Sequence, residues 1–167
     1  MVESAGLDQG ALFTVAFPVP PLLVRPPAET PAAASRPTLQ GLHLLVVEDE
    51  ESGREMLAEL LEQLGAEVTA TASAAEAFAA FEKMIQDVLI SDIGMPGESG
   101  YDLLRKVRMF SPARGGLVPA IAFTAYSSEQ DRLDALAAGF QMYQTKPADP
   151  ARLVAAIAML GHRPTIM

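Results

Sequence analysis

The sequence of 167 residues contains no cysteine. This absence excludes a disulfide framework, a thiolate metal site and a cysteine nucleophile. It also suits a reducing compartment. We therefore expect a cytoplasmic protein whose stability comes from an ordinary apolar core.

Basic residues are scarce. The chain has 12 lysines and arginines against 21 aspartates and glutamates, which gives a formal net charge of −9 at pH 7. Such a surface repels nucleic-acid phosphates and anionic lipid headgroups. We therefore expect neither nucleic acid nor a membrane surface as a direct partner.

An uninterrupted apolar run long enough to leave or cross a membrane is also missing. The apolar stretch 11–24 follows Glu3 and Asp8 where a signal peptide would have a basic segment. Prolines at positions 18, 20 and 21 break the stretch. It is predicted to be neither a signal peptide nor a membrane span.

What the chain does contain indicates one globular domain with an extension. Half of the residues are apolar and 20% are charged, which is typical of a packed core. Seven of the 13 prolines lie between Pro18 and Pro37, beside a run of alanines. We interpret residues 18–40 as a linker, residues 41–162 as the domain and residues 163–167 as a tail.

Within residues 41–162 the pattern alternates between short apolar runs and helical segments. Five strands are predicted, at 42–47, 68–72, 88–91, 120–124 and 141–145. The first helix, 51–64, shows an apolar stripe made of Met56, Leu57, Leu60, Leu61 and Leu64. A further helix is predicted from about residue 101 to residue 109. The other helices are predicted to start at caps formed by Ser73 with Glu76, Ser127 with Gln130, and Asp149 before Pro150. Repeated βα units of this kind predict an α/β fold with a parallel sheet.

Polar side chains follow the predicted strands. Glu48, Asp49 and Glu50 follow the first strand, Asp92 follows the third, and Thr124 and Lys146 stand at the ends of the fourth and fifth. Ligands of open α/β sheets bind beyond the carboxyl ends of the strands, so these side chains should converge there. Carboxylates brought close together repel unless a cation lies among them, and Mg²⁺ prefers oxygen ligands. We therefore expect a Mg²⁺ site.

The same set of residues suits phosphoryl transfer to a carboxylate. Asp92 can act as a nucleophile and form an aspartyl-phosphate if charge on the transferring group is neutralised. Lys146 can pair with one phosphoryl oxygen and the hydroxyl of Thr124 can donate to another. We therefore interpret Asp92 as the phosphoacceptor.

Four segments, VVEDE, SDIGMPGESG, FTAY and YQTKP, resemble the successive motifs of the response-regulator receiver family. The resemblance covers residues 41 to about 160. It implies a flavodoxin-like doubly wound sheet of five parallel strands in the order 2-1-3-4-5, with helices on both faces, an order that receivers exemplify. It also implies a switch and not an enzyme, because no kinase motif is present.

The resemblance assigns a role to each site residue. By its motifs, Asp92 is the phosphoacceptor, Glu48 and Asp49 are the acidic metal pair, and the backbone carbonyl of Gly94 is a further metal ligand. Thr124 and Tyr143 are the switch residues, and the bond between Lys146 and Pro147 is cis. The implied partner is a histidine kinase or a histidine phosphotransfer protein. The face of the fourth helix, fifth strand and fifth helix is the implied contact surface, and a homodimer through that face is an alternative use of it.

Other readings stay open at this point. Each site residue taken alone also fits an ordinary structural role, such as a turn aspartate or a surface lysine. An aspartate-nucleophile phosphatase would need Asp-x-Asp where this chain has Glu48-Asp49-Glu50, and a flavin or nucleotide binder would need a Gly/Ser/Thr-rich loop there. A receiver that only binds partners would not need the acceptor, threonine and lysine together. His43 and His162 are not expected to carry phosphate.

Residues 1–17 precede the linker and contain a further predicted strand. Residues 10–18 alternate like a half-buried strand that has no strand nearby to pair with, so we expect it to be mobile. The segment is similar to the closing strand of the ATP-binding domain of sensor histidine kinases. This similarity implies the carboxyl-terminal part of a hybrid kinase, and the alternative is an apolar tail that packs on the domain or on a partner.

Overall fold

The computed structural model describes residues 2–4, 11–13, 38–125 and 127–161. The chain divides into two compact units, residues 1–34 and residues 35–167, and each is described by itself. The larger unit contains the predicted domain. No helix in the described ranges is long and apolar enough to span a membrane.

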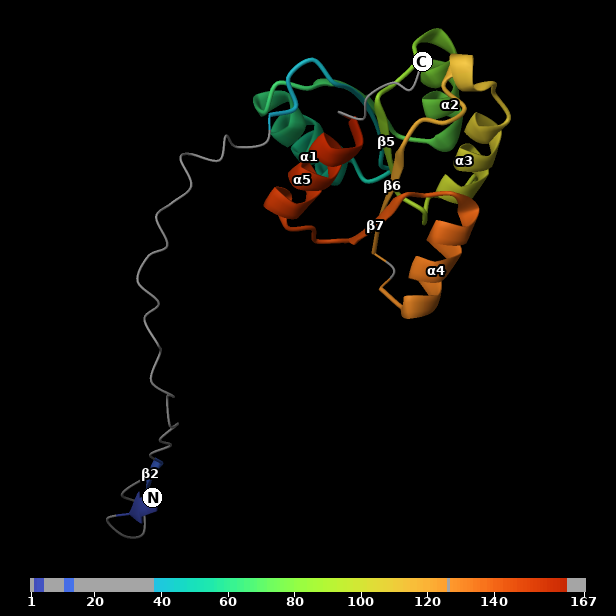
Figure 1. The fold of residues 1–167 in the computed structure, drawn as a ribbon. Coiled ribbons are helices and arrows are strands. Elements are labelled where there is room, and N and C mark those ends of the chain that lie inside the picture. The colour runs from blue at the N-terminus through green and yellow to red at the C-terminus, as the bar shows by residue number, and fades with distance from the viewer. Residues whose placement is uncertain (1, 5–10, 14–37, 126, 162–167) are drawn as a thin grey trace. The chain divides into compact units, whose positions relative to one another are not determined.

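The larger unit is built on a sheet of five parallel strands in the order β4-β3-β5-β6-β7 (Figure 1). Counted along the domain, this is the order 2-1-3-4-5, so the predicted flavodoxin-like topology is confirmed. The strands are β3 (His43–Val47), β4 (Glu67–Thr71), β5 (Val88–Ser91), β6 (Ala120–Thr124) and β7 (Met142–Thr145). The helices are α1 (Glu51–Gln63), α2 (Ala74–Lys83), α3 (Gly100–Arg108), α4 (Glu129–Ala138) and α5 (Pro150–Gly161), with a short 3₁₀ turn, η1, at Pro112–Arg114.

Helices cover both faces of the sheet. Figure 1 shows α1 and α5 on one side and α2, α3 and α4 on the other. Side chains of a strand alternate between these two layers, so Leu44 and Val46 belong to the core under α1 and α5. Leu45 and Val47 belong to the core under α2, α3 and α4. Strands buried on both faces explain the unbroken apolar runs of the sequence.

Two predicted details of the helices are wrong. The cap of α4 is Ser128 with Asp131, and not Ser127 with Gln130: the Ser128 hydroxyl accepts from the Asp131 N–H, and the Asp131 carboxylate accepts from Ser128. A carboxylate near a helix N-terminus is favoured over an amide, because it is charged. In α1, Met56 is 70% exposed although it was predicted to belong to the apolar stripe. Of this stripe, only Leu57 and Leu61, four residues apart, are buried.

The predicted domain boundary at residue 41 lies too late in the chain. Leu39 is 0% exposed and belongs to the core under α1 and α5. Its N–H donates to the carbonyl of Leu64 at 3.1 Å, and its own carbonyl accepts from the N–H of Leu42 at 3.0 Å. The packed domain therefore includes residues 38–40, which had been predicted as linker.

The smaller unit contains two short strands, β1 (Val2–Ser4) and β2 (Ala11–Phe13). They pair antiparallel, with Val2 opposite Phe13 and Ser4 opposite Ala11. The prediction that the apolar strand has no local partner is therefore wrong, because a three-residue strand carries too little pattern to be found in a sequence. The rest of that predicted strand, most of the predicted linker and the tail at 163–167 lie outside the described residues.

Candidate functional site

The parallel register brings the strand ends together at one edge of the sheet. Val47 of β3 lies opposite Ser91 of β5, so the residues that follow them, Glu48 and Asp92, are neighbours. The N–H of Asp92 donates to the carbonyl of Val47 at 2.9 Å. Across the sheet, the N–H of Lys146 donates to the carbonyl of Thr124 at 2.8 Å. Backbone hydrogen bonds thus fix the positions from which the side chains of Asp92 and Lys146 extend.

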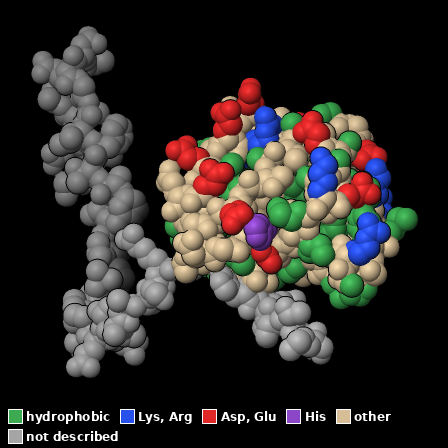
Figure 2. All heavy atoms as spheres, turned by 90° about the horizontal axis from the view of Figure 1, so that it is seen from above, with side chains coloured by type: hydrophobic (Ala, Val, Ile, Leu, Met, Phe, Trp, Pro, Cys, Tyr) green, Lys and Arg blue, Asp and Glu red, His purple; other side chains and the backbone are tan. Residues whose placement is uncertain are grey.

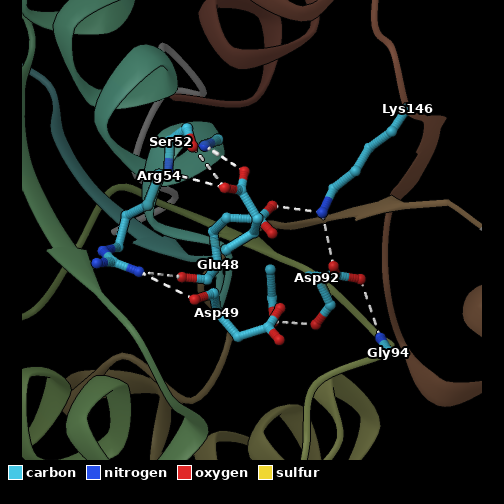
Figure 3. Close-up of polar contacts among 10 residues, drawn as sticks. Glu48, Asp49, Ser52, Arg54, Asp92, Gly94 and Lys146 are labelled. Atoms are coloured by element: carbon cyan, nitrogen blue, oxygen red, sulfur yellow. Dashed lines mark hydrogen bonds and ion pairs between the residues drawn. The ribbon is translucent and has the colours of Figure 1, made fainter.

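Lys146 links two carboxylates (Figure 3). Its Nζ lies 2.6 Å from Oδ2 of Asp92 and 2.5 Å from Oε2 of Glu48. Glu48 is only 2% exposed and Asp92 only 7% exposed, so both ion pairs lie largely out of water. The peptide bond between Lys146 and Pro147 is cis, as the resemblance implies.

The environment perturbs the ionisation of this group. Burial raises the pKa of Glu48 above its ordinary value, although the hydrogen bond from Lys146 opposes the change. For Lys146, burial alone would lower the pKa, but the hydrogen bonds to Asp92 and Glu48 outweigh burial and the pKa is raised. The lysine is therefore held firmly as a cation between two acids.

A third carboxylate lies beside this pair. Carboxylate oxygens of Glu48, Asp49 and Asp92 all lie within 4.8 Å of one another, and the side chain of Asp49 is exposed. One ammonium group does not balance three carboxylates, so the site retains an excess of negative charge. Hard oxygen donors, excess negative charge and access from solvent through Asp49 fit a divalent ion such as Mg²⁺.

Gly94 contributes its backbone to the same site. Its N–H donates to Oδ1 of Asp92 at 2.9 Å, which holds the carboxylate in the turn that follows β5 (Figure 3). The contribution of its carbonyl to a metal stays a prediction.

Glu48, Asp49 and Glu50 are called the acidic triplet, and its last residue, Glu50, caps α1. Its Oε1 accepts from the N–H and the hydroxyl of Ser52 at 3.0 and 2.6 Å, and its Oε2 accepts from the N–H of Gly53 at 2.6 Å. The hydrogen bond from the Ser52 hydroxyl, followed by the backbone bonds, lowers the pKa of Glu50. This carboxylate is therefore engaged as the N-cap of α1.

The two predicted switch residues lie on the neighbouring strands. Thr124, at the end of β6, is 1% exposed. Tyr143, on β7, is partly buried and packs against the core under α2, α3 and α4. Burial raises the pKa of its phenol, with a further contribution from Asp131 of α4. These positions are compatible with the predicted roles and do not test them.

His43 lies at the other end of the sheet. It opens β3, five residues before Glu48, and its Nδ1 lies 3.3 Å from a carboxylate oxygen of Glu67. The view of Figure 2 shows a histidine with acidic side chains beside it. His43 therefore has no part in the site around Asp92, and His162 lies outside the described residues.

Sequence reasoning missed one residue of this region, Arg54. Its Nη1 donates to the backbone carbonyl of Glu48 at 2.9 Å and to that of Asp49 at 3.3 Å. An arginine on the polar side of a helix gives no signal in a sequence, because its spacing matches that of any solvated side chain.

With the geometry established, the comparison with known proteins decides the family. The profile of the response regulator receiver domain matches residues 44–158. The chain belongs to this receiver family. The match covers every strand of the sheet except the first residue of β3, and it includes each of the site residues Glu48, Asp92, Thr124 and Lys146.

Relatives and solved structures agree with this assignment. The receiver is 42% identical over 117 residues to an uncharacterized 14.6 kDa protein of Leptolyngbya boryana, covering 70% of this chain and 88% of that protein. It is 39% identical over 120 residues to the sensory transduction protein RegX3 of Mycolicibacterium smegmatis, covering 72% of this chain but only 50% of RegX3. It thus spans about half the length of that relative.

Among solved structures, the receiver domain of the sensor histidine kinase PA1611 from Pseudomonas aeruginosa PAO1 aligns with a TM-score of 0.67 and 30% identity. The alignment covers 74% of this chain and 99% of that domain. That structure has a magnesium ion coordinated in its active site cleft.

Proposed function

We propose that this receiver accepts a phosphoryl group on Asp92 from a phosphohistidine of a histidine kinase or phosphotransfer protein. The observation that carries the proposal is the contact of one lysine, Lys146, with both Asp92 and Glu48, with the carboxylate of Asp49 close by. The Lys146 ammonium would attract a phosphoryl group, and the carboxylates would attract a divalent ion. An aspartyl-phosphate is the covalent product that these groups can support.

In the proposed transfer, a carboxylate oxygen of Asp92 forms a bond to phosphorus while the bond from phosphorus to the imidazole nitrogen of the donor breaks. The electron pair of that bond returns to the imidazole. Lys146 passes from the Asp92 carboxylate to a phosphoryl oxygen, and the hydroxyl of Thr124 donates to another. Glu48, Asp49, Asp92 and the carbonyl of Gly94 would hold a Mg²⁺ ion, whose positive charge would offset the negative charge of the transferring group.

The proposed output is a change of surface, not a chemical product. Movement of Thr124 toward the phosphoryl group would leave room for Tyr143 to turn inward, which changes the face of α4, β7 and α5. A partner, or a second copy of the chain, would read this face. Hydrolysis of the aspartyl-phosphate, or return of the phosphoryl group to a histidine, would reset the switch.

We also propose a setting for this receiver: the carboxyl-terminal part of a hybrid sensor histidine kinase in the cytoplasm. Two observations support it. The PA1611 structure shows that receivers occur within sensor histidine kinases. In addition, the sequence of residues 10–18, with Phe-Thr-Val before a proline, is similar to the closing strand of a kinase ATP-binding domain.

The proposal is tested by incubating the chain with acetyl phosphate and Mg²⁺ and measuring its intact mass. We expect one added phosphoryl group per chain, and no addition when EDTA removes the metal. Labelling that persists in EDTA would contradict the metal site. Steady release of phosphate from simple phosphomonoesters, without a labelled protein, would favour a phosphatase instead.

A further inference from the structure

The side chain of Arg54 holds the backbone of the loop between β3 and α1. Its Nη1 donates to the carbonyls of Glu48 and Asp49, and its backbone N–H donates to the carbonyl of Glu50 at 3.0 Å. Three consecutive carbonyls of the acidic triplet therefore accept hydrogen bonds from one residue. Figure 3 shows the guanidinium reaching back to this loop from α1.

The loop needs such a support because two of its residues carry the candidate metal ligands. Glu48 and Asp49 lie between the end of β3 and the start of α1, outside any strand or helix. The carbonyls that Arg54 contacts belong to these same two residues. The contacts therefore hold the backbone that carries both carboxylate side chains. Glu50 is already fixed by its role as the cap of α1.

We propose that Arg54 is a positioning residue for the metal site: it holds the backbone of Glu48 and Asp49 so that their carboxylates face Asp92 before a metal binds. This inference rests on the proposed function, since it concerns the same site. Groups that orient metal ligands without touching the metal typically change affinity about 10- to 100-fold when they are removed.

Charge and position predict opposite effects of removing Arg54. The guanidinium is a cation beside an acidic cluster, so its charge alone opposes Mg²⁺, and its loss would tighten binding. Loss of the two hydrogen bonds frees the ligands, and would weaken binding. The direction of the change in affinity therefore separates a positioning role from a purely electrostatic one.

The experiment measures Mg²⁺ affinity by titration calorimetry for four forms of the full chain. Arg54→Met keeps an unbranched apolar stem and removes the charge and all donors, whereas Arg54→Lys keeps the charge and one donor group. Arg132→Met is the matched control, because Arg132 is an exposed arginine of α4 that pairs with Glu129, three residues away. The thermal midpoint of each form in EDTA reports on folding without metal.

We expect Arg54→Met to bind Mg²⁺ about 10- to 100-fold more weakly than the parent, Arg54→Lys to lie between them, and Arg132→Met to equal the parent. At saturating Mg²⁺, labelling of Arg54→Met by acetyl phosphate should return close to the parental rate, because Asp92, Thr124 and Lys146 are intact. The Mg²⁺ concentration for half-maximal labelling should rise by the same factor as the dissociation constant.

Unchanged or tighter Mg²⁺ binding by Arg54→Met would overturn the inference, as would an equal change in Arg132→Met. If Arg54→Met does not fold, Arg54→Lys decides: weaker binding supports the positioning role, and parental binding overturns it. A parent chain that binds no Mg²⁺ would instead contradict the proposed function itself.

Discussion

Lys146 faces two buried carboxylates with a single positive charge, and Asp49 adds a third carboxylate at the solvent side. Such an arrangement costs stability in the absence of a metal, because like charges held within a few ångströms repel. The site therefore lowers the folding stability of the metal-free chain, which is a common trade-off between stability and activity at functional sites.

This trade-off predicts that Asp49→Asn stabilises the metal-free chain. Removing one of three adjacent negative charges should raise the free energy of unfolding in EDTA by on the order of 1 kcal/mol or less. The same change should weaken Mg²⁺ binding at least about 10-fold, because a charged oxygen ligand is replaced by a neutral one. Urea denaturation with and without Mg²⁺ measures both effects. Glu82→Gln, at an exposed position of α2, is the control and should show neither. A less stable Asp49→Asn in EDTA would contradict this account.

At the same scale, the acidic triplet shows where sequence reasoning stopped. The strand-end position predicted that Glu48 and Asp49 belong to the site, because a buried strand must deliver its next residues to the edge of the sheet. The strand-end position did not predict a separate role for Glu50. A carboxylate beside a helix N-terminus can cap the helix or bind a metal, and the direction of its side chain decides between them.

Among the helices and strands, the order could be predicted more securely than the boundaries. Apolar runs and helical stripes extend over whole elements, so they predicted all five strands of the sheet and all five helices of the larger unit. A cap depends on one residue. Ser127 and Ser128 are adjacent serines, and only the reach of the Asp131 carboxylate distinguishes them. The exposed Met56 shows the same limit at the border of an apolar stripe.

The corrected cap of α4 predicts unequal effects of two adjacent substitutions. Ser128→Ala should destabilise the domain by about 1 kcal/mol, because the hydroxyl that accepts from the Asp131 N–H is lost. Ser127→Ala, its neighbour, should change stability by less than about 0.5 kcal/mol. Chemical denaturation of the two variants side by side measures the difference. Equal effects would contradict a cap at Ser128. A larger effect at Ser127 would indicate that the cap is Ser127, as the sequence first suggested.

At the scale of the whole molecule, the fold accounts for where the site lies. All five strands of the sheet run parallel, so their carboxyl ends lie at one edge, and residues from 48 to 146 meet there although they are far apart in the sequence. This part of the architecture was predictable. The start of the domain was not, because Leu39 follows a proline-rich segment and is a single apolar residue without a periodic pattern around it.

Because Leu39 is buried, removing residues 38–40 is predicted to lower the stability of the domain. A chain of residues 38–167 should unfold at the same denaturant concentration as the full-length protein, since the linker reading makes the first segment separable. A chain of residues 41–167 should lose about 2–4 kcal/mol, because the core under α1 and α5 loses a fully buried side chain. Leu39→Ala in the longer fragment is the control and should reproduce most of this loss. Equal stability of the two fragments would show that Leu39 adds nothing to the core.

The central claim is that Asp92 alone receives the phosphoryl group, and intact-mass measurement of Asp92→Asn tests it most directly. The variant keeps the size of the side chain and an acceptor for the N–H of Gly94, but it lacks the nucleophilic carboxylate. Asp134→Asn, at an exposed position of α4, is the matched control. With acetyl phosphate and Mg²⁺, the parent and Asp134→Asn should each gain one phosphoryl group per chain, and Asp92→Asn should gain none. Stoichiometric labelling of Asp92→Asn would contradict the assignment of the site.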